Sequence, residues 1–171
     1  MIKKILVTYA SRTGTTAGVA DAIGKTLADK GMDVDILQMK DVRDLSPYDA
    51  VIAGSAIHSA KWLPEAIEFL EKNRAELSEK KFASFMVCMT LAMPNAEKYR
   101  QGITEWMAPV RRIIRPLKEG LFAGSLHIAK IPSFSDRLKF RVSLWTGVWK
   151  AGDHRDWDAI RKWADELSSL L

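Results

Sequence analysis

The most constraining stretch of the chain is a short polar run between an apolar segment and a helical pattern. The apolar residues 5–7 precede it and predict a buried strand. The pattern that follows repeats apolar residues on one helix face, at Val19, Ala20, Ile23 and Leu27. The polar run itself comprises Ser11, Arg12, Thr13, Gly14, Thr15 and Thr16. Its place between a strand and a helix predicts the first turn of an α/β unit.

This polar run has the composition of a phosphate-binding loop. The free N–H groups and the dipole at a helix start favour an anion, and Ser or Thr hydroxyls add hydrogen bonds. Gly14 would let the backbone approach the ligand closely. The sequence has no Walker-type lysine here and no G-x-G-x-x-G pattern, so neither a nucleoside triphosphate nor a dinucleotide is indicated. The alternative is an ordinary strand-to-helix turn with a Ser or Thr cap.

The run S-R-T-G-T-T after a first strand resembles the phosphate loop of flavodoxins, Ser/Thr-x-Thr-Gly-x-Thr, which holds the phosphate of FMN. The resemblance extends along essentially the whole chain. It implies FMN as the cofactor, and a loop built for one terminal phosphate favours FMN over FAD.

Five strand patterns alternate with helical patterns along the chain. We expect strands at about 3–8, 34–37, 48–54, 82–89 and 121–126. We expect helices at about 15–30, 64–77, 96–115 with a kink or restart at Pro109, and 157–170. The alternation predicts an α/β fold with a parallel sheet. The resemblance implies a flavodoxin-like three-layer sandwich, with a five-stranded parallel sheet of order 2-1-3-4-5, as a single domain over residues 1–171. A ligand is then expected at the carboxyl ends of strands 1 and 3, where the order reverses.

By the same resemblance, the loops after strands 3 and 4 would lie against the flavin ring. The expected contacts are Gly54, Ser55, Ala56, Ile57, His58 and Trp62 in the second loop, and Thr90, Leu91 and Ala92 in the third. A flavin needs backbone amides at its polar edge and flat or apolar groups on its faces. His58 and Trp62 could supply a face, and His58 is the one candidate catalytic residue. The alternatives are an exposed loop histidine and a tryptophan that staples the next helix.

The rim formed by these two loops has no carboxylate before Glu65, and it carries His58 and Lys61. The flavin of electron-transfer flavodoxins usually has acidic surroundings. A neutral-to-basic rim should stabilise the anionic reduced flavin and favour two-electron turnover, which is a hypothesis that a redox titration tests.

The positive charge of the chain is concentrated late in the sequence. The net charge is +5, and residues 98–155 carry twelve lysines and arginines against four acidic residues. A localised basic region suggests an anionic partner. Residues 127–156 form a long insert before the last helix, with Leu138, Val142, Trp145 and Trp149 on one helical face. Basic residues on the other side make this an interfacial-membrane pattern; the alternative is a helix packed on the sheet edge.

With this insert, the sequence resembles more narrowly the menaquinone-dependent protoporphyrinogen oxidases, which are basic flavodoxin-fold enzymes with an aromatic, Arg/Lys-rich loop before the last helix. The matching stretches are residues 124–138, 145–152 and Trp157. The resemblance implies an FMN oxidoreductase of haem biosynthesis that takes two electrons from protoporphyrinogen IX and passes them to a quinone. Substrate or membrane contacts are expected from Lys130, Arg137, Lys139, Arg141, Trp145 and Trp149. The rivals are a flavodoxin electron carrier and an FMN-dependent quinone or nicotinamide-dependent reductase.

Several classes of partner are not expected. The basic segment has no recognised nucleic-acid motif. The single cysteine, Cys88, lies in an apolar run, which predicts a buried thiol and neither a disulfide nor a cysteine-rich metal site. The chain starts with a strand pattern and not a signal peptide, and no apolar run approaches the ~20 residues of a spanning helix. We expect a cytoplasmic protein with peripheral contact on the inner face of the cell membrane.

Overall fold

The central sheet has five parallel strands in the predicted order. The computed structural model describes residues 3–171, so the expectation for the first two residues, Met1 and Ile2, lies outside the described residues. The strands are β1 (Lys4–Ala10), β2 (Asp33–Gln38), β3 (Ala50–His58), β5 (Lys81–Cys88) and β6 (Glu119–Ala123), and they pair in the order β2-β1-β3-β5-β6. If only the parallel strands are numbered, this is the order 2-1-3-4-5. The predicted strand order is therefore confirmed.

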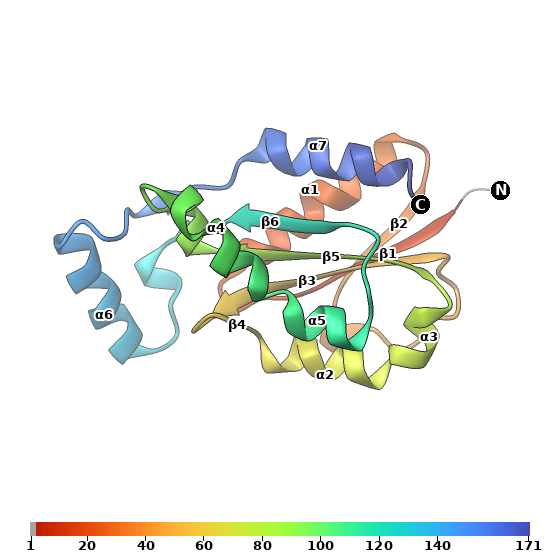
Figure 1. The fold of residues 1–171 in the computed structure, drawn as a ribbon, viewed down its shortest axis with the longest axis horizontal. Coiled ribbons are helices and arrows are strands. Elements are labelled where there is room, and N and C mark those ends of the chain that lie inside the picture. The colour runs from red at the N-terminus through yellow and green to blue at the C-terminus, as the bar shows by residue number, and fades with distance from the viewer. Residues whose placement is uncertain (1–2) are drawn as a thin grey trace.

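Helices cover both faces of this sheet (Figure 1). One face is covered by α1 (Thr15–Asp29) and α7 (Trp157–Ser168). The other is covered by α2 (Pro64–Lys72), α3 (Arg74–Ser78) and α5 (Ala108–Ile113). The remaining helix of the sandwich, α4 (Ala96–Glu105), packs on the 3-10 turn η2 (Met89–Ala92) that follows β5. The predicted three-layer sandwich is therefore confirmed.

Two buried apolar clusters hold the layers together. Ile5 and Val7 point toward α1 and α7, while Leu6 joins the opposite cluster, because successive strand residues alternate between faces. Close packing also explains why residue 54 is a glycine, because a Cβ there would lie 2.0 Å from a ring carbon of Phe85. The expectation that the strand ends at Gly54 is wrong: Gly54 makes room for Phe85, and β3 continues to His58.

Two predicted helices are interrupted. The helix expected at 64–77 breaks at Asn73, whose side-chain Nδ2 donates to the carbonyl of Phe69 at 2.8 Å and so competes with the helical pattern. The helix expected at 96–115 restarts as α5 with Pro109 in its first turn, as predicted, but it ends at Ile113.

The insert projects beyond the carboxyl ends of the strands (Figure 1). It begins with β7 (Ser125–Leu126) and η3 (Ile128–Lys130), continues as α6 (Phe134–Trp145), and returns through β8 (Gly152–Asp153). None of residues 134–145 is buried, so α6 does not pack on the sheet edge. None of the helices within residues 3–171 is both long and apolar enough to cross a bilayer.

The helix in the insert is shorter than the sequence pattern predicted. Gly147 has φ of 73° and donates to Leu144, while the N–H of Val148 donates to Ser143 at 3.0 Å. These two bonds form a Schellman cap, which ends α6 at Trp145. The expectation that Trp145 and Trp149 share one helical face is therefore wrong.

Candidate functional site

A cleft of about 980 Å³ opens at the carboxyl ends of the central strands. Its walls come from three parts of the chain: the loop after β1, the end of β3 with the turn that follows it, and the insert. The position matches the reversal of strand order between β1 and β3. The volume is near the top of the roughly 300–1,000 Å³ found for small-molecule sites.

The loop after β1, residues 11–16, leaves the start of α1 open for an anion. Gly14 caps the helix with φ of 84°, and no side chain of the described residues bonds to the free N–H groups of its first turn. By contrast, Asp156 caps α7 by accepting the N–H of Ala159 at 2.9 Å. The alternative of an ordinary Ser or Thr cap is therefore wrong for α1. Thr16 lines the cleft, and its fully buried hydroxyl has no hydrogen-bond partner within residues 3–171.

The other side chains of this loop have separate tasks. The hydroxyl of Ser11 accepts the N–H of Gly14 at 3.1 Å and so shapes the turn. Arg12 lines the cleft, but its guanidinium forms a solvent-exposed salt bridge with Glu65 at 3.1 Å. Thr13 and Thr15 line the cleft with their hydroxyls 3.2 Å apart. Ser11 and Gly14 therefore build the loop, and the three threonines face the cleft.

The expected second loop is instead a tight β-hairpin. Ile57 pairs with Trp62 and His58 with Lys61 of β4 (Lys61–Trp62), because Ser59 and Ala60 adopt left-handed φ values of 50° and 62°. These strained positions are concentrated at the rim of the cleft.

Within the hairpin, only part of the predicted set lines the cleft. Ala56, Ile57, His58 and Trp62 do so. Gly54 packs on Phe85, and Ser55 is buried, where its hydroxyl accepts the N–H of Leu63 at 3.0 Å and donates to the carbonyl of Ala56 at 2.7 Å. Gly54 and Ser55 therefore support the hairpin from below.

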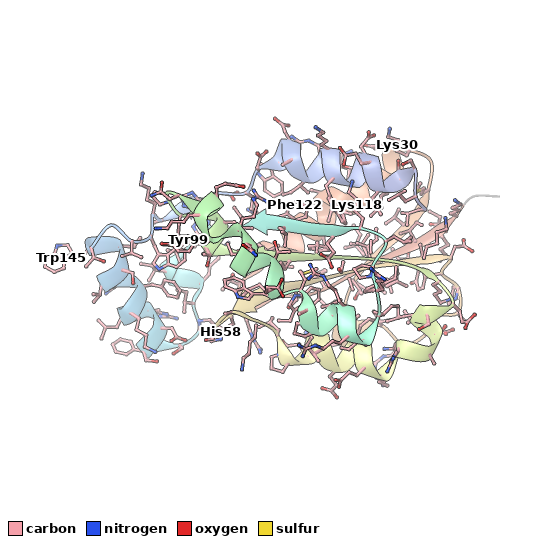
Figure 2. All side chains as sticks on the ribbon, in the orientation of Figure 1. Lys30, His58, Tyr99, Lys118, Phe122 and Trp145 are labelled. Atoms are coloured by element: carbon pink, nitrogen blue, oxygen red, sulfur yellow. The ribbon has the colours of Figure 1, made fainter. Side chains whose placement is uncertain are left out.

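His58 and Trp62 differ in burial. His58 is exposed at the hairpin end, at the edge of the domain toward α6 (Figure 2). Trp62 is 4% exposed and belongs to the core beneath α2, as expected of a residue that staples the next helix. It also lines the cleft, and its indole N–H has no acceptor among the described residues.

The floor of the cleft comes from the end of β5. Thr90 lines it, whereas Leu91 and Ala92, which also belong to η2, do not line it. Cys88 also lines the floor, and burial raises the pKa of its thiol to about 11, so it stays protonated at neutral pH. Trp106, after α4, is a cleft residue that the sequence pattern did not single out.

The insert places only half of its predicted contacts in the cleft. Lys130, Lys139 and Trp149 line it, while Arg137, Arg141 and Trp145 do not. Arg137 donates to the carbonyl of Ile131 and so braces the turn before α6. Trp145 is 89% exposed and points away from the domain (Figure 2). Further cleft residues of the insert that the sequence analysis missed are Ser125, His127, Ile131 and Phe140.

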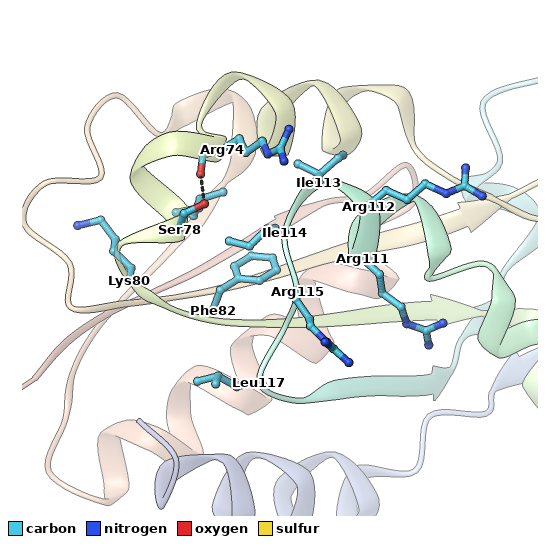
Figure 3. A pocket seen from close by; sticks show the side chains of 11 residues that line it. Arg74, Ser78, Lys80, Phe82, Arg111, Arg112, Ile113, Ile114, Arg115 and Leu117 are labelled. Carbon is cyan, nitrogen blue, oxygen red and sulfur yellow. Dashed lines mark hydrogen bonds between the residues drawn. The ribbon is translucent and has the colours of Figure 1, made fainter.

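A second hollow, of about 420 Å³, lies at the opposite end of the sheet between α3 and α5 (Figure 3). Arg74, Arg111, Arg112, Arg115 and Lys80 surround it. Arg111 is bound to both carboxylate oxygens of Glu119 at 2.7 Å, and this hydrogen bonding raises its pKa. In Figure 3 the side chains of Arg112 and Lys80 point in opposite directions and do not converge. The basic region 98–155 is therefore divided between the two ends of the sheet.

The residues of the main cleft fit a flavin mononucleotide. Its phosphate suits the open helix start and the hydroxyl of Thr16, which has no partner among residues 3–171. Ala56, Ile57 and Val87 offer apolar contacts for a ring, and the indole N–H of Trp62 is a donor without an acceptor in the described part of the chain. No cluster of three metal-binding side chains occurs within residues 3–171.

Comparison with known proteins identifies the family. The flavodoxin domain family model matches residues 6–152. A protein of Leishmania major, "Protoporphyrinogen IX dehydrogenase [quinone]", is 26% identical over 98% of this chain and 75% of its own length. Among solved structures, a flavodoxin from the domain Archaea matches with a TM-score of 0.56, at 19% identity over 98% of this chain and 97% of its own. The Streptococcus pneumonia TIGR4 flavodoxin matches with a TM-score of 0.58, at 18% identity over 98% and 99%. Both structures show the same fold. The chain therefore belongs to the flavodoxin domain family, and its cofactor is FMN.

Proposed function

We propose that the protein is an FMN-dependent oxidoreductase of haem biosynthesis that oxidises protoporphyrinogen IX and reduces a quinone. The observation that carries this proposal is the second wall of the cleft. The insert builds this wall opposite the hairpin of β3 and β4. The cleft, at about 980 Å³, is near the upper end of the range for small-molecule sites. The name of the Leishmania major relative supports the same reaction.

The chemistry of the insert wall suits an apolar donor with carboxylates. Ile131, Phe140 and Trp149 supply apolar contacts, and Lys130 and Lys139 supply cations. Lys139 is 3.5 Å from Asp136 in an exposed pair, which leaves it free to exchange partners at little cost. A porphyrinogen combines a large apolar ring with two propionates, so it matches both properties of this wall.

The residues of the chain bind and orient the reactants, and bound FMN supplies the two-electron chemistry. In each turnover, two electrons and two protons leave the donor, and a quinone that takes them up becomes a quinol. Three such turnovers convert a porphyrinogen into a porphyrin. The rim beside the hairpin carries His58 and Lys61, and Glu65 is held by Arg12. This neutral-to-basic rim favours two-electron turnover.

The experiment is anaerobic addition of protoporphyrinogen IX to the FMN-loaded protein, followed at the flavin absorbance. We expect bleaching by the donor and recovery of the absorbance on addition of menadione. If the flavin stays oxidised with this donor, the proposed reaction is wrong. Bleaching by NADH or NADPH instead would identify a nicotinamide-dependent reductase. Reduction only by a redox protein would identify a flavodoxin carrier.

We also propose that the outer side of α6 contacts an anionic membrane surface. Phe134, Leu138, Val142 and Trp145 are all more than half exposed and follow one another along the helix. Phe134 and Trp145 are 80% and 89% exposed. Arg141 and Lys150 are exposed in the same segment, and acidic headgroups attract such residues by ~1 kcal/mol each. An apolar face with basic charge beside it suits reversible attachment, and a quinone acceptor resides in the bilayer.

A further inference from the structure

The insert leaves and re-enters the domain through a two-stranded ribbon. β7 pairs with β8 in antiparallel register, with Ser125 opposite Asp153 and Leu126 opposite Gly152. The N–H of His154 continues the pairing by donating to the carbonyl of Gly124 at 3.1 Å. Residues 127–151 therefore form an excursion whose two ends are held together. Two sets of contacts join these ends to the phosphate loop.

The first set is a chain of three hydroxyl groups. The Thr13 hydroxyl is 3.2 Å from that of Thr15, which is 2.8 Å from that of Ser125. Each hydroxyl carries one proton, so two hydrogen bonds among three hydroxyls leave one proton free for an anion. All three residues line the cleft. Ser125 therefore decides, together with the anion, which way the hydroxyls of the loop point.

The second set is made by Arg155, directly after the ribbon. Its Nη1 donates to the backbone carbonyl of Thr15 at 3.2 Å, and its Nε and Nη2 donate to Asp153 at 2.8 and 2.7 Å. The guanidinium lies 4.4 Å from the ring centre of Trp157, and the side chain is only 16% exposed. Gly18 makes room for it, because a Cβ there would lie 2.5 Å from Nη1. A cation is thus fixed against the first turn of α1.

We propose that the ribbon is part of the FMN phosphate site, with Ser125 as a positioning residue, and that FMN binding and ordering of the insert are therefore coupled. The phosphate orients the hydroxyl chain, the chain holds Ser125, and Ser125 and Arg155 hold the two ends of residues 127–151. Coupling between two sites is reciprocal. A loosened insert therefore lowers the affinity for FMN, and removal of FMN loosens the insert. The proposal rests on FMN binding and is independent of the donor and the quinone.

The test compares the FMN-free and FMN-loaded full chain by hydrogen exchange, with FMN itself as the probe. We expect FMN to slow exchange in residues 127–151 as well as in the phosphate loop. Ser125→Ala should weaken FMN binding by about fivefold, the value of one ordinary hydrogen bond, and should reduce the protection of the insert. Ser125→Thr keeps the hydroxyl and should restore both. Ser168→Ala, at the far end of α7, is the matched control and should change neither.

Two results would overturn the proposal: unchanged FMN affinity in Ser125→Ala, or exchange in residues 127–151 that FMN does not alter. Exchange of the central sheet in the same samples reports whether the variant is folded. Gly18→Ala provides a second probe, because alanine is the better helix former but its Cβ displaces Arg155. We expect this variant to bind FMN more weakly; FMN affinity equal to that of the wild type would exclude a role for Arg155. These binding and exchange measurements use neither a donor nor a quinone. Their results therefore stay valid even if the protein does not catalyse the proposed reaction.

Discussion

The phosphate loop and the insert both face the cleft with groups that attract anions, but they do so by different physical means. The loop uses short hydroxyls and backbone N–H groups on a buried turn, and Thr16 is fully buried. The insert uses long lysine side chains on a segment whose helix has no buried residue within 134–145. The backbone N–H donors of the loop are therefore fixed before a ligand arrives, whereas the lysine donors of the insert must be ordered by it.

This difference separates the expected effects of substitution. Changes in the loop should act strongly, and through the affinity for FMN. Changes in the insert should act weakly, and they should divide between the inner side, which faces the cleft, and the outer side, which faces solvent.

The largest effect is expected from Thr13→Ala combined with Thr16→Ala. Both residues line the cleft, and a hydrogen bond to a charged phosphate contributes ~1.5–3 kcal/mol. We expect FMN binding to weaken at least about tenfold for each residue, as measured by titration of the FMN-free protein. Thr26→Ala is the control, because Thr26 lies on the same helix and its hydroxyl donates to the backbone carbonyl of Ala22. A double variant that binds FMN as tightly as the wild type would contradict the assignment of this loop.

The loop was predictable because its signal is local. The residue types of 11–16 and the flanking strand and helix patterns suffice to place the free N–H groups at a sheet edge. The role of Ser125 was not predictable, since it is brought to Thr15 only by the pairing of β7 with β8. The hairpin after β3 was also missed, because the turn uses Ser59 and Ala60 at positive φ and not the Gly or Asn that marks such turns.

The second prediction concerns the outer side of the insert. Trp145→Ala with Phe134→Ala should weaken sedimentation with anionic phosphatidylglycerol vesicles by about tenfold, because both side chains are exposed and apolar. Trp149→Ala should leave vesicle binding unchanged, since Trp149 lines the cleft. Leu117→Ala, an exposed leucine at the other end of the sheet, is the matched control. Binding by the wild type should weaken with salt; absence of binding at low salt would exclude the membrane proposal.

The insert was harder to predict because periodicity does not show where a helix ends. A helical pattern carried through residue 149 puts both tryptophans on one face, whereas the cap at Gly147 turns Trp149 into the cleft. Gly147 was the signal that could have corrected this. Charge counting had a similar limit: the arginines at 111–115 belong to the opposite end of the sheet, which only the topology reveals.

The third prediction concerns the inner side of the insert. Lys130→Ala with Lys139→Ala should raise the KM for an anionic donor by roughly fivefold and leave FMN affinity unchanged, because exposed cations contribute less than 1 kcal/mol each. Arg112→Ala with Arg115→Ala removes the same charge at the distant hollow and serves as the control. Equal effects of the two double variants would mean that net charge, and not the cleft, attracts the donor.

The smallest effect is expected from protonation of Asp153, at the end of the ribbon, as the pH falls. Hydrogen bonding from Arg155 lowers the pKa of Asp153, with burial opposing this shift and His127 adding to it. A carboxylate whose pKa is lower in the folded state stabilises that state above its unfolded pKa of about 3.9, and this contribution is lost as the pH falls through the folded value. In the FMN-free protein, proteolysis of residues 127–151 by pepsin should therefore rise as the pH drops below about 4. Asp153→Asn should be cleaved more readily above that pH and should lack this rise, since the amide cannot titrate. If the two proteins show the same pH dependence, the contact between Asp153 and Arg155 does not hold the insert, and the ribbon is fixed by the hydroxyl chain alone.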